Sequence, residues 1–339
     1  MTPLKIHHIG SFQDEKYLLT SEEPLEEVWN HIGRFGTSFI ARNFEPEKKN
    51  ISWDEHIAYA KVRVRQALEF RSAAKSGSLL TAPLPLYYSF LNLTRAMMAL
   101  GPEVIPKSAH GLKFLAGEEL LSSCVQLTKG TFTDYLDAQG ISWTNESQIS
   151  LSDALGFIIE MAYDYQLFDV TRGHVQAISV RAIVNGPIQL HLLNYPNEFA
   201  TDWQKDFPEL AQICTAEETN VLLIKEEHRP NDYSAIAKLL ESVLFPGLTL
   251  QNHATWYGFR KSKHTSRLTR ASYYYVAIFI LGSIVRYQPE LLLAATTADS
   301  EIGWLLQRFI KLAERFFPQL KLMEAYKSQV YFSGSGGSF

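Results

Sequence analysis

An arginine and an asparagine stand in the middle of an otherwise apolar stretch, PLPLYYSFLNLTRAMMALG, residues 83–101. The spacing of Tyr88, Asn92 and Arg95 places the three side chains on one stripe of a helix. Arg95 is the only charged residue of the stretch. Because an unpaired guanidinium is costly in a buried helix, Arg95 needs a partner. Either a neighbouring Asp or Glu neutralises it, or its planar fork binds an anionic ligand such as a phosphate.

A histidine beside a glycine follows in the next loop, where the sequence reads AHGLK. An imidazole titrates near neutral pH, so His110 could carry a proton in a reaction. It could equally cap a helix or bond a backbone carbonyl. We take His110 and Arg95 as candidate catalytic residues. The candidate ligand- and phosphate-binding residues of this region are Tyr88, Asn92, Arg95 and Lys113.

A basic segment lies within the acid-free stretch from Ser242 to Pro289. Most of its charge is in GFRKSKHTSRLTR, residues 258–270, next to Trp256 and Tyr257. Basic groups beside aromatic rings suit the phosphates and bases of nucleic acids or nucleotides. They suit equally a solvated loop whose charges pair with acidic surface. The candidate phosphate-binding residues here are Arg260, Lys261, Lys263, His264, Arg267 and Arg270.

A further arginine, Arg286, lies near the end of the apolar segment ASYYYVAIFILGSIVRY. A cation in the last turn of a helix complements the helix dipole, which is a sufficient structural reason for this residue. Arg286 could also face Arg95 across a bundle of helices. The start of the same helix, next to the basic segment, would favour a phosphate through its free backbone amides.

The hydrophobic pattern predicts the framework that must position these residues. Helical spacing dominates toward both ends of the chain, whereas runs such as CVQLTKGTF and HVQAISVRAIV predict strands between them. We predict an α+β fold that is mainly α, with a helical core formed by both chain ends and an inserted α+β portion. The expected parts are an N-terminal arm (1–53), two parts of the helical core (54–116 and 260–327), the α+β insertion (117–259) and a flexible tail (328–339).

The composition is typical of a folded, soluble protein, with 46% hydrophobic and 20% charged residues. A net charge of -4 gives no overall bias toward nucleic acid. The apolar run 271–285 is shorter than the about 20 residues that span a bilayer. Cys124 and Cys214 lack metal-type spacing, which favours reduced thiols. We expect a cytoplasmic protein without a signal peptide or membrane span.

The common catalytic and cofactor motifs are missing from the sequence. It contains no glycine-rich phosphate loop, no dinucleotide fingerprint, no GxSxG elbow and no zinc-protease motif. We therefore predict neither a cofactor nor a metal.

Three stretches resemble the YaaC-like family of bacterial proteins. They are PLPLYYSFLNLTRAMM, the HGL of residues 110–112, and YYYVAIFILGSIVRYQPELL. They occur in the same order, and the resemblance runs through most of the chain. It implies no settled biochemical activity.

A more distant likeness is to the HEPN superfamily, helical bundles found in toxins, antiviral ribonucleases and nucleotide-binding modules. In these bundles, a helix with paired aromatics and an N/H-x-x-R/K-A centre packs on a preceding long helix. The matching residues here are Tyr87, Tyr88, Asn92, Arg95 and Ala96. HEPN ribonucleases also carry an Arg and a His separated by a polar stretch, and the nearest pair here, Arg260 and His264, is too closely spaced. The likeness implies the bundle and leaves ribonuclease activity open.

Two classes of function follow. The first is binding of nucleic acid or nucleotide phosphates, in a bacterial antiviral defence system that acts on RNA. The alternative is a non-enzymatic regulatory or interaction module that binds a small nucleotide or a protein partner, or a structural subunit of a larger complex. The sequence does not set the oligomeric state.

Overall fold

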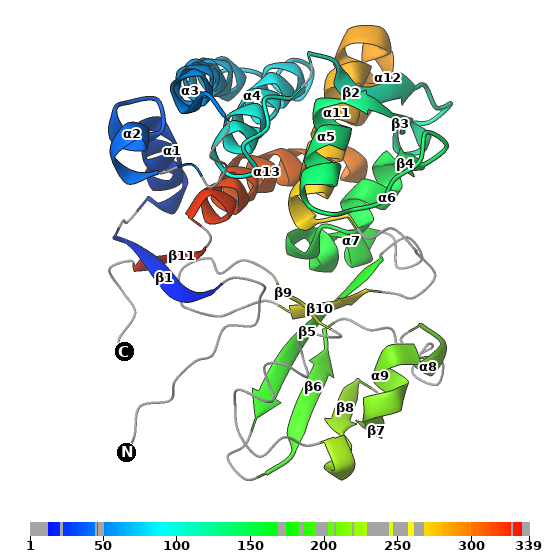
Figure 1. Cartoon of the computed structure of the whole chain (residues 1–339). Coiled ribbons are helices and arrows are strands. Elements are labelled where there is room, and N and C mark those ends of the chain that lie inside the picture. The colour runs from blue at the N-terminus through cyan, green and yellow to red at the C-terminus, as the bar shows by residue number, and fades with distance from the viewer. Residues whose placement is uncertain are drawn as a thin grey trace. The chain divides into compact units, whose positions relative to one another are not determined.

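The computed structural model describes residues 13–20, 23–44, 46, 51–106, 108–168, 174–182, 186–193, 203–206, 208–218, 220–228, 244–246, 257–260, 268–297, 299–326 and 328–333. The chain has an α+β fold that is mainly helical (Figure 1). It divides into two compact units. The helical unit consists of Glu15–Leu155 and Arg267–Phe339, and the sheet unit is built mainly from Gly156–Ser266. The division predicted from the sequence placed the start of the insertion earlier, at residue 117.

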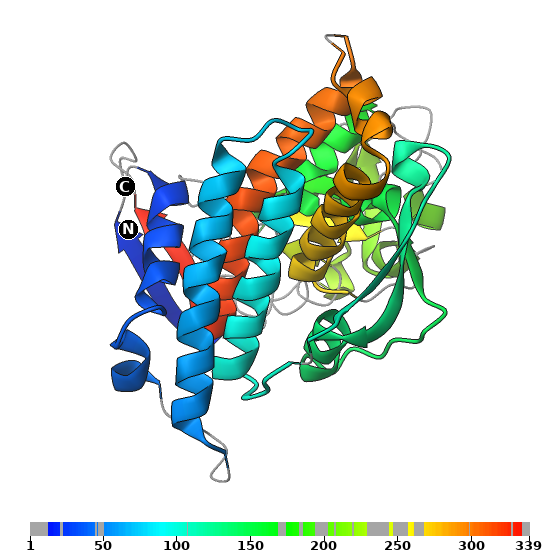
Figure 2. The same ribbon diagram turned by 90° about the horizontal axis from the view of Figure 1, so that it is seen from above.

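The helical unit is organised around one central helix, α4 (Pro83–Leu100). Of its 18 residues, 15 are buried, because helices pack against it from several sides. Figure 2 shows α3 and α11 on either side of α4. The other helices of this unit are α1 (Pro24–Arg34), α2 (Phe39–Asn43), α3 (Trp53–Lys75), α11 (Arg270–Tyr287), α12 (Pro289–Ala295) and α13 (Glu301–Tyr326).

Local sequence signals set the bounds and the spacing of α4 and α11. Pro83 occupies the first turn of α4, where its missing N–H breaks no helical hydrogen bond. The hydroxyl of Thr269 caps α11 by accepting a hydrogen bond from the backbone N–H of Ser272. The two helices approach closely at Gly282, where an added Cβ would lie 3.4 Å from the Cα of Leu84.

A small antiparallel sheet completes the helical unit, in the order β2-β3-β4. Residue His110 pairs with Gly130, and the register shifts between His110 and Leu112. Gly111 lies in the left-handed region with φ 85°, and an added Cβ would lie 2.8 Å from the backbone nitrogen of Phe132. Only glycine fits there, so Gly111 fixes the path of the chain beside His110. The elements are β2 (His110–Leu115), β3 (Cys124–Gly130), α5 (Thr131–Ala138), β4 (Gln148–Ser150) and α6 (Leu151–Gly156).

The sheet unit contains an antiparallel sheet in the order β7-β8-β6-β5-β10-β9. A hydrogen bond between two buried amides joins helix α7 to strand β5 of this sheet: Nε2 of Gln166 donates to Oε1 of Gln176 over 2.7 Å. The segment YSAIAKLLESVLF, residues 233–245, predicts a helix; most of it lies outside the described residues, and Leu244 and Phe245 begin a strand instead. The elements are α7 (Ala162–Phe168), β5 (Val175–Ala182), β6 (Ile188–Leu192), α8 (Trp203–Asp206), α9 (Pro208–Ile213), β7 (Cys214–Glu218), β8 (Val221–Ile224), β9 (Leu244–Pro246) and β10 (Tyr257–Arg260).

Two strands from opposite ends of the sequence form a separate pair. They are β1 (Gln13–Thr20) and β11 (Ser328–Ser333). Residues 328–333 belong to the stretch that the sequence predicted as a flexible tail, and 334–339 lie outside the described residues. Cys124 and Cys214 are free thiols. Among the helices that the structure describes, none is by itself both long and apolar enough to cross a membrane.

Candidate functional site

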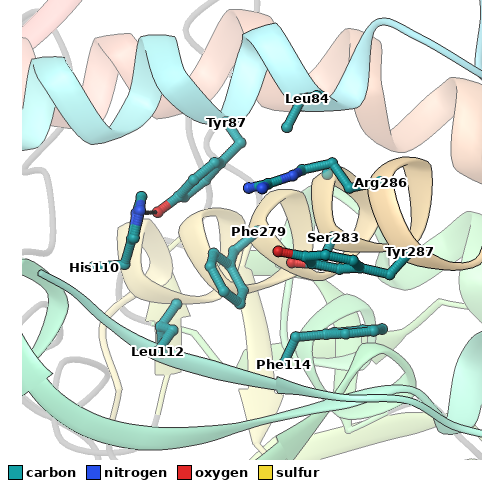
Figure 3. A pocket seen from close by; sticks show the side chains of 10 residues that line it. Leu84, Tyr87, His110, Leu112, Phe114, Phe279, Ser283, Arg286 and Tyr287 are labelled. Atoms are coloured by element: carbon teal, nitrogen blue, oxygen red, sulfur yellow. Dashed lines mark hydrogen bonds between the residues drawn. The ribbon is translucent and has the colours of Figure 1, made fainter.

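A cavity of about 470 Å³ opens between α4, β2 and α11 (Figure 3). The strand contributes alternate residues, which lie on one face of a strand. Helix α11 contributes residues spaced by three and four positions, which lie on one helical stripe. The lining side chains are Leu84 and Tyr87 of α4, His110, Leu112 and Phe114 of β2, and Phe279, Ser283, Arg286 and Tyr287 of α11.

Tyr87 and His110 are joined by a short hydrogen bond, with 2.5 Å between the phenol oxygen and Nδ1. Burial raises the pKa of Tyr87 well above its ordinary value, so the phenol keeps its proton. Burial first, and then the charges of Arg95 and Arg286, lower the pKa of His110 from its ordinary 6.5, so the imidazole is neutral at pH 7. An imidazole nitrogen is a better acceptor than a phenol oxygen. Tyr87 therefore donates to Nδ1, and Nε2 carries the imidazole proton.

Arg286 supplies a positive charge to the cavity. Its guanidinium lies 5.0 Å from the ring centroid of Tyr287 and points toward Tyr87 (Figure 3). Within the described part of the chain, no Asp or Glu lines the cavity or forms an ion pair with Arg286. The hydroxyl of Ser283 and the N–H of His110 add neutral donors. The cavity is therefore suited to an anion.

Aromatic rings make up much of the remaining wall. Phe279 meets Tyr87 edge to face, with ring centroids 5.0 Å apart. Phe114 lies parallel to Tyr287 within 20°, with centroids 6.2 Å apart. Such walls favour a ligand that has a flat apolar part as well as a negative charge.

The sequence matches the family described as YaaC-like Protein over residues 36–324. The chain belongs to the YaaC-like family. The match includes every residue that lines the cavity. Comparison with curated proteins and with solved structures gives no match. The description of the YaaC-like family names no activity, so the chemistry of the site must indicate the function.

Arg95 of this YaaC-like protein lies behind the cavity rather than in its wall. Only 7% of the residue is exposed. Its Nε donates to the hydroxyl of Thr131 over 3.0 Å, and its Nη2 donates to the carbonyl of Ser108 over 2.6 Å. Ser108 precedes β2, and Thr131 follows β3. Arg95 thus holds the chain around His110 and acts on the cavity through position and charge.

Tyr88 and Asn92, the other members of the predicted stripe, contact α3. The ring of Tyr88 stacks on Phe70 with centroids 5.2 Å apart. Asn92 is 4% exposed, and its side-chain oxygen accepts a hydrogen bond from Arg63. Both side chains join α4 to the preceding helix and are absent from the cavity wall.

The other predicted phosphate-binding residues are distributed over the chain. Lys113 is exposed and lies on the face of β2 opposite to Leu112 and Phe114. Arg260 ends β10 in the sheet unit, where it pairs with Val175. Arg270 begins α11 in the helical unit. The remaining members of the basic segment, Lys261, Lys263, His264 and Arg267, lie outside the described residues.

His110 is the one candidate from the sequence that lines the cavity in the described structure. Arg286, which was not a candidate, lines it as well. The sequence reasoning missed Phe114, Ser283 and Tyr287. The spacing of Ser283 and Arg286 predicts that both lie on one side of a helix. It does not predict which element packs against that side. Within the part of the chain that the structure describes, no group of three His, Cys, Asp or Glu side chains could hold a metal ion.

Proposed function

We propose that this protein binds a small phosphate-bearing ligand of the nucleotide class in the cavity between α4, β2 and α11. The observation that carries the proposal is the Arg286 guanidinium, which faces a cavity beside His110 that no Asp or Glu of the described residues lines. A guanidinium presents a planar fork of donors that matches the oxygens of a phosphate. The size supports a small ligand, because the 470 Å³ cavity falls in the range of about 300–1,000 Å³ typical of ligand sites.

The wider proposal includes nucleic acid as the ligand, a HEPN-like helical core and a role in antiviral defence. The packing of α4 on the long preceding helix α3 supports the bundle likeness. The residues that would carry polynucleotide binding, in the 261–267 part of the basic segment, lie outside the described residues. The cavity therefore supports a free nucleotide, and a regulatory binding module, more directly than a polynucleotide or a ribonuclease.

Titration calorimetry with inorganic phosphate and with adenosine 5′-monophosphate (AMP) tests the proposal. We expect both to bind the wild-type protein, and Arg286→Gln to weaken binding at least about tenfold because a charge-assisted hydrogen bond is lost. Lys113→Gln is the matched control, since it removes a positive charge from the exposed face of β2. It should leave the affinity unchanged.

A thermal-shift measurement provides a second readout, because a ligand that binds only the native state raises the melting temperature. Failure of both ligands to bind at low salt would contradict the proposal. Binding that is equal in wild type and Arg286→Gln would place the ligand elsewhere. A short RNA that binds both proteins equally well would favour the basic segment at 258–270.

A further inference from the structure

Two aromatic rings at the edge of the cavity face each other across a gap. The rings of Phe114 and Tyr287 are 20° from parallel, with centroids 6.2 Å apart, and Figure 3 shows one above the other. Carbon atoms in contact lie roughly 3.5–4 Å apart, so a flat ring inserted between two others needs roughly 7 Å. The centroid separation is less than this width, so a third ring enters when the exposed ring of Tyr287 moves outward by roughly 1 Å.

A contact with Arg286 orients the ring of Tyr287. Tyr287 is the last residue of α11 and is 60% exposed, so burial alone does not fix its ring. The guanidinium of Arg286 lies 5.0 Å from the ring centroid, and Figure 3 shows it on the side away from Phe114. This cation–π contact orients Tyr287 and leaves its other face toward the gap.

Phe114 of strand β2 forms the opposite side of the gap. Phe114 lies on the same face of β2 as His110 and Leu112, so the strand sets its distance from His110. The cationic group and the ring pair consequently share one cavity. A ligand that uses both must carry a negative charge and a flat ring, joined by a spacer that crosses the region of Ser283.

We propose that Phe114 and Tyr287 form an aromatic clamp that holds the base of a nucleotide while its phosphate binds Arg286 and His110. The inference rests on the proposed function and narrows its ligand class from phosphate esters in general to nucleoside phosphates. Stacking uses the π face that every base has, so the clamp accepts different bases. The larger purine ring gives more contact than a pyrimidine.

Calorimetry with AMP, uridine 5′-monophosphate (UMP) and ribose 5-phosphate separates the clamp from the phosphate site. We expect AMP to bind about tenfold more tightly than ribose 5-phosphate, with UMP between them. Tyr287→Leu should weaken AMP binding about tenfold and change ribose 5-phosphate binding less than about twofold. Tyr287→Phe should retain the wild-type affinity, because it keeps the ring.

Trp304→Leu is the control, since it removes another exposed aromatic ring, 55% exposed, from a helix outside the cavity. It should leave all affinities unchanged. A fluorescent 2-aminopurine nucleotide provides an independent signal, because stacking between the rings quenches its emission in wild type but not in Tyr287→Leu. Equal binding of AMP and ribose 5-phosphate to the wild-type protein would overturn the clamp and leave the phosphate site standing. Binding of none of the three ligands would refute the proposed function itself.

Discussion

The phenol oxygen of Tyr87 lies 2.5 Å from Nδ1 of His110, and this bond joins α4 to the start of β2. Both groups are neutral near pH 7, because burial raises the pKa of the phenol and lowers that of the imidazole. The phenol therefore selects the imidazole form with the proton on Nε2. Tyr87 is a positioning residue in this arrangement, since it acts on a ligand through His110.

Replacing Tyr87 with Phe tests this relationship. The change leaves Nδ1 of His110 without its donor, so we expect the free energy of unfolding to fall by about 1–2 kcal/mol. Phosphate affinity should fall a few-fold, because the imidazole loses its fixed orientation. Denaturant titration and calorimetry measure the two effects. Tyr88→Phe is the control, since its ring stacks on Phe70 and the described structure gives its hydroxyl no hydrogen bond.

Nitrogen NMR of the wild-type protein checks the same assignment directly. We expect His110 to carry its proton on Nε2 at pH 7 and to change form in Tyr87→Phe. A wild-type spectrum with the proton on Nδ1 would show that His110 is the donor and Tyr87 the acceptor.

Anion binding should depend on pH through His110. Burial and the charges of Arg95 and Arg286 lower the pKa of His110 from 6.5 in the free protein, and a bound anion should raise it again. Protonation of His110 then favours binding, so the affinity should increase as the pH falls from 7.5 to about 5. Sulfate is the suitable probe, because it remains a dianion throughout this range.

The matched variant is His110→Gln, which keeps a side-chain donor but does not titrate. Its sulfate affinity should be independent of pH over the same range.

Without a ligand, the free energy of unfolding of the wild-type protein should fall as the pH falls. The unfolded chain binds the His110 proton more readily than the folded one, so wild type should lose stability relative to the variant as the pH falls below 6.5. Identical pH profiles for the two proteins would contradict a role of His110 in anion binding.

Arg95 should matter more for stability than for direct ligand contact. Arg95→Met removes the donors to Ser108 and Thr131 and leaves the buried hydroxyl of Thr131 without its charged partner, so we expect a loss of about 2 kcal/mol. Arg95→Lys should lose less, because it keeps the charge but not the two-sided geometry. Denaturant unfolding measures both. A change below about 0.5 kcal/mol in Arg95→Met would show that the contacts carry little of the stability.

The sequence was most informative where the signal is local. The pattern of residues 83–101 predicted a buried helix that begins at Pro83 and stops at Gly101, and the structure confirms it. The need of Arg95 for a partner also followed from the sequence. The identity of its contacts did not, because Ser108 and Thr131 are brought to it by the β2–β3 pairing rather than by helical spacing.

The cavity could not be predicted from the sequence, because its walls are brought together by strand pairing and helix packing. The sequence predicts a loop up to Phe114, yet His110–Leu115 forms β2 because it pairs with β3. Strand formation depends on such cross-strand packing more than on local propensity. Without that strand, nothing placed His110 and Phe114 on one face. The segment 131–138 was likewise not recognised as helix α5. The sequence singles out Arg286 as a charge near the end of an apolar helix, but its position in the cavity wall with His110 depends on the packing of α11 against α4.

The helical unit should lose stability in acid through Glu26 of α1. This carboxylate accepts hydrogen bonds from Arg71 over 2.7 Å and from Lys75 over 2.6 Å, and Arg71 also contacts Glu314 of α13. The hydrogen bonds from Arg71 and Lys75 lower the pKa of Glu26 from 4.5 to about 2. A lowered carboxyl pKa contributes stability that is present above pH 4.5 and is lost as the pH falls toward 2.

Glu26→Gln should therefore cost about 1 kcal/mol at pH 7, because solvent screens a side chain that is 39% exposed. The difference from wild type should shrink below pH 4.5 and disappear near pH 2. Urea titrations at several pH values measure it, with the exposed Glu118→Gln as the control that shows no such dependence. A difference between Glu26→Gln and wild type that stays constant from pH 7 to 2.5 would mean that Glu26 stabilises the helices by packing rather than through its charge.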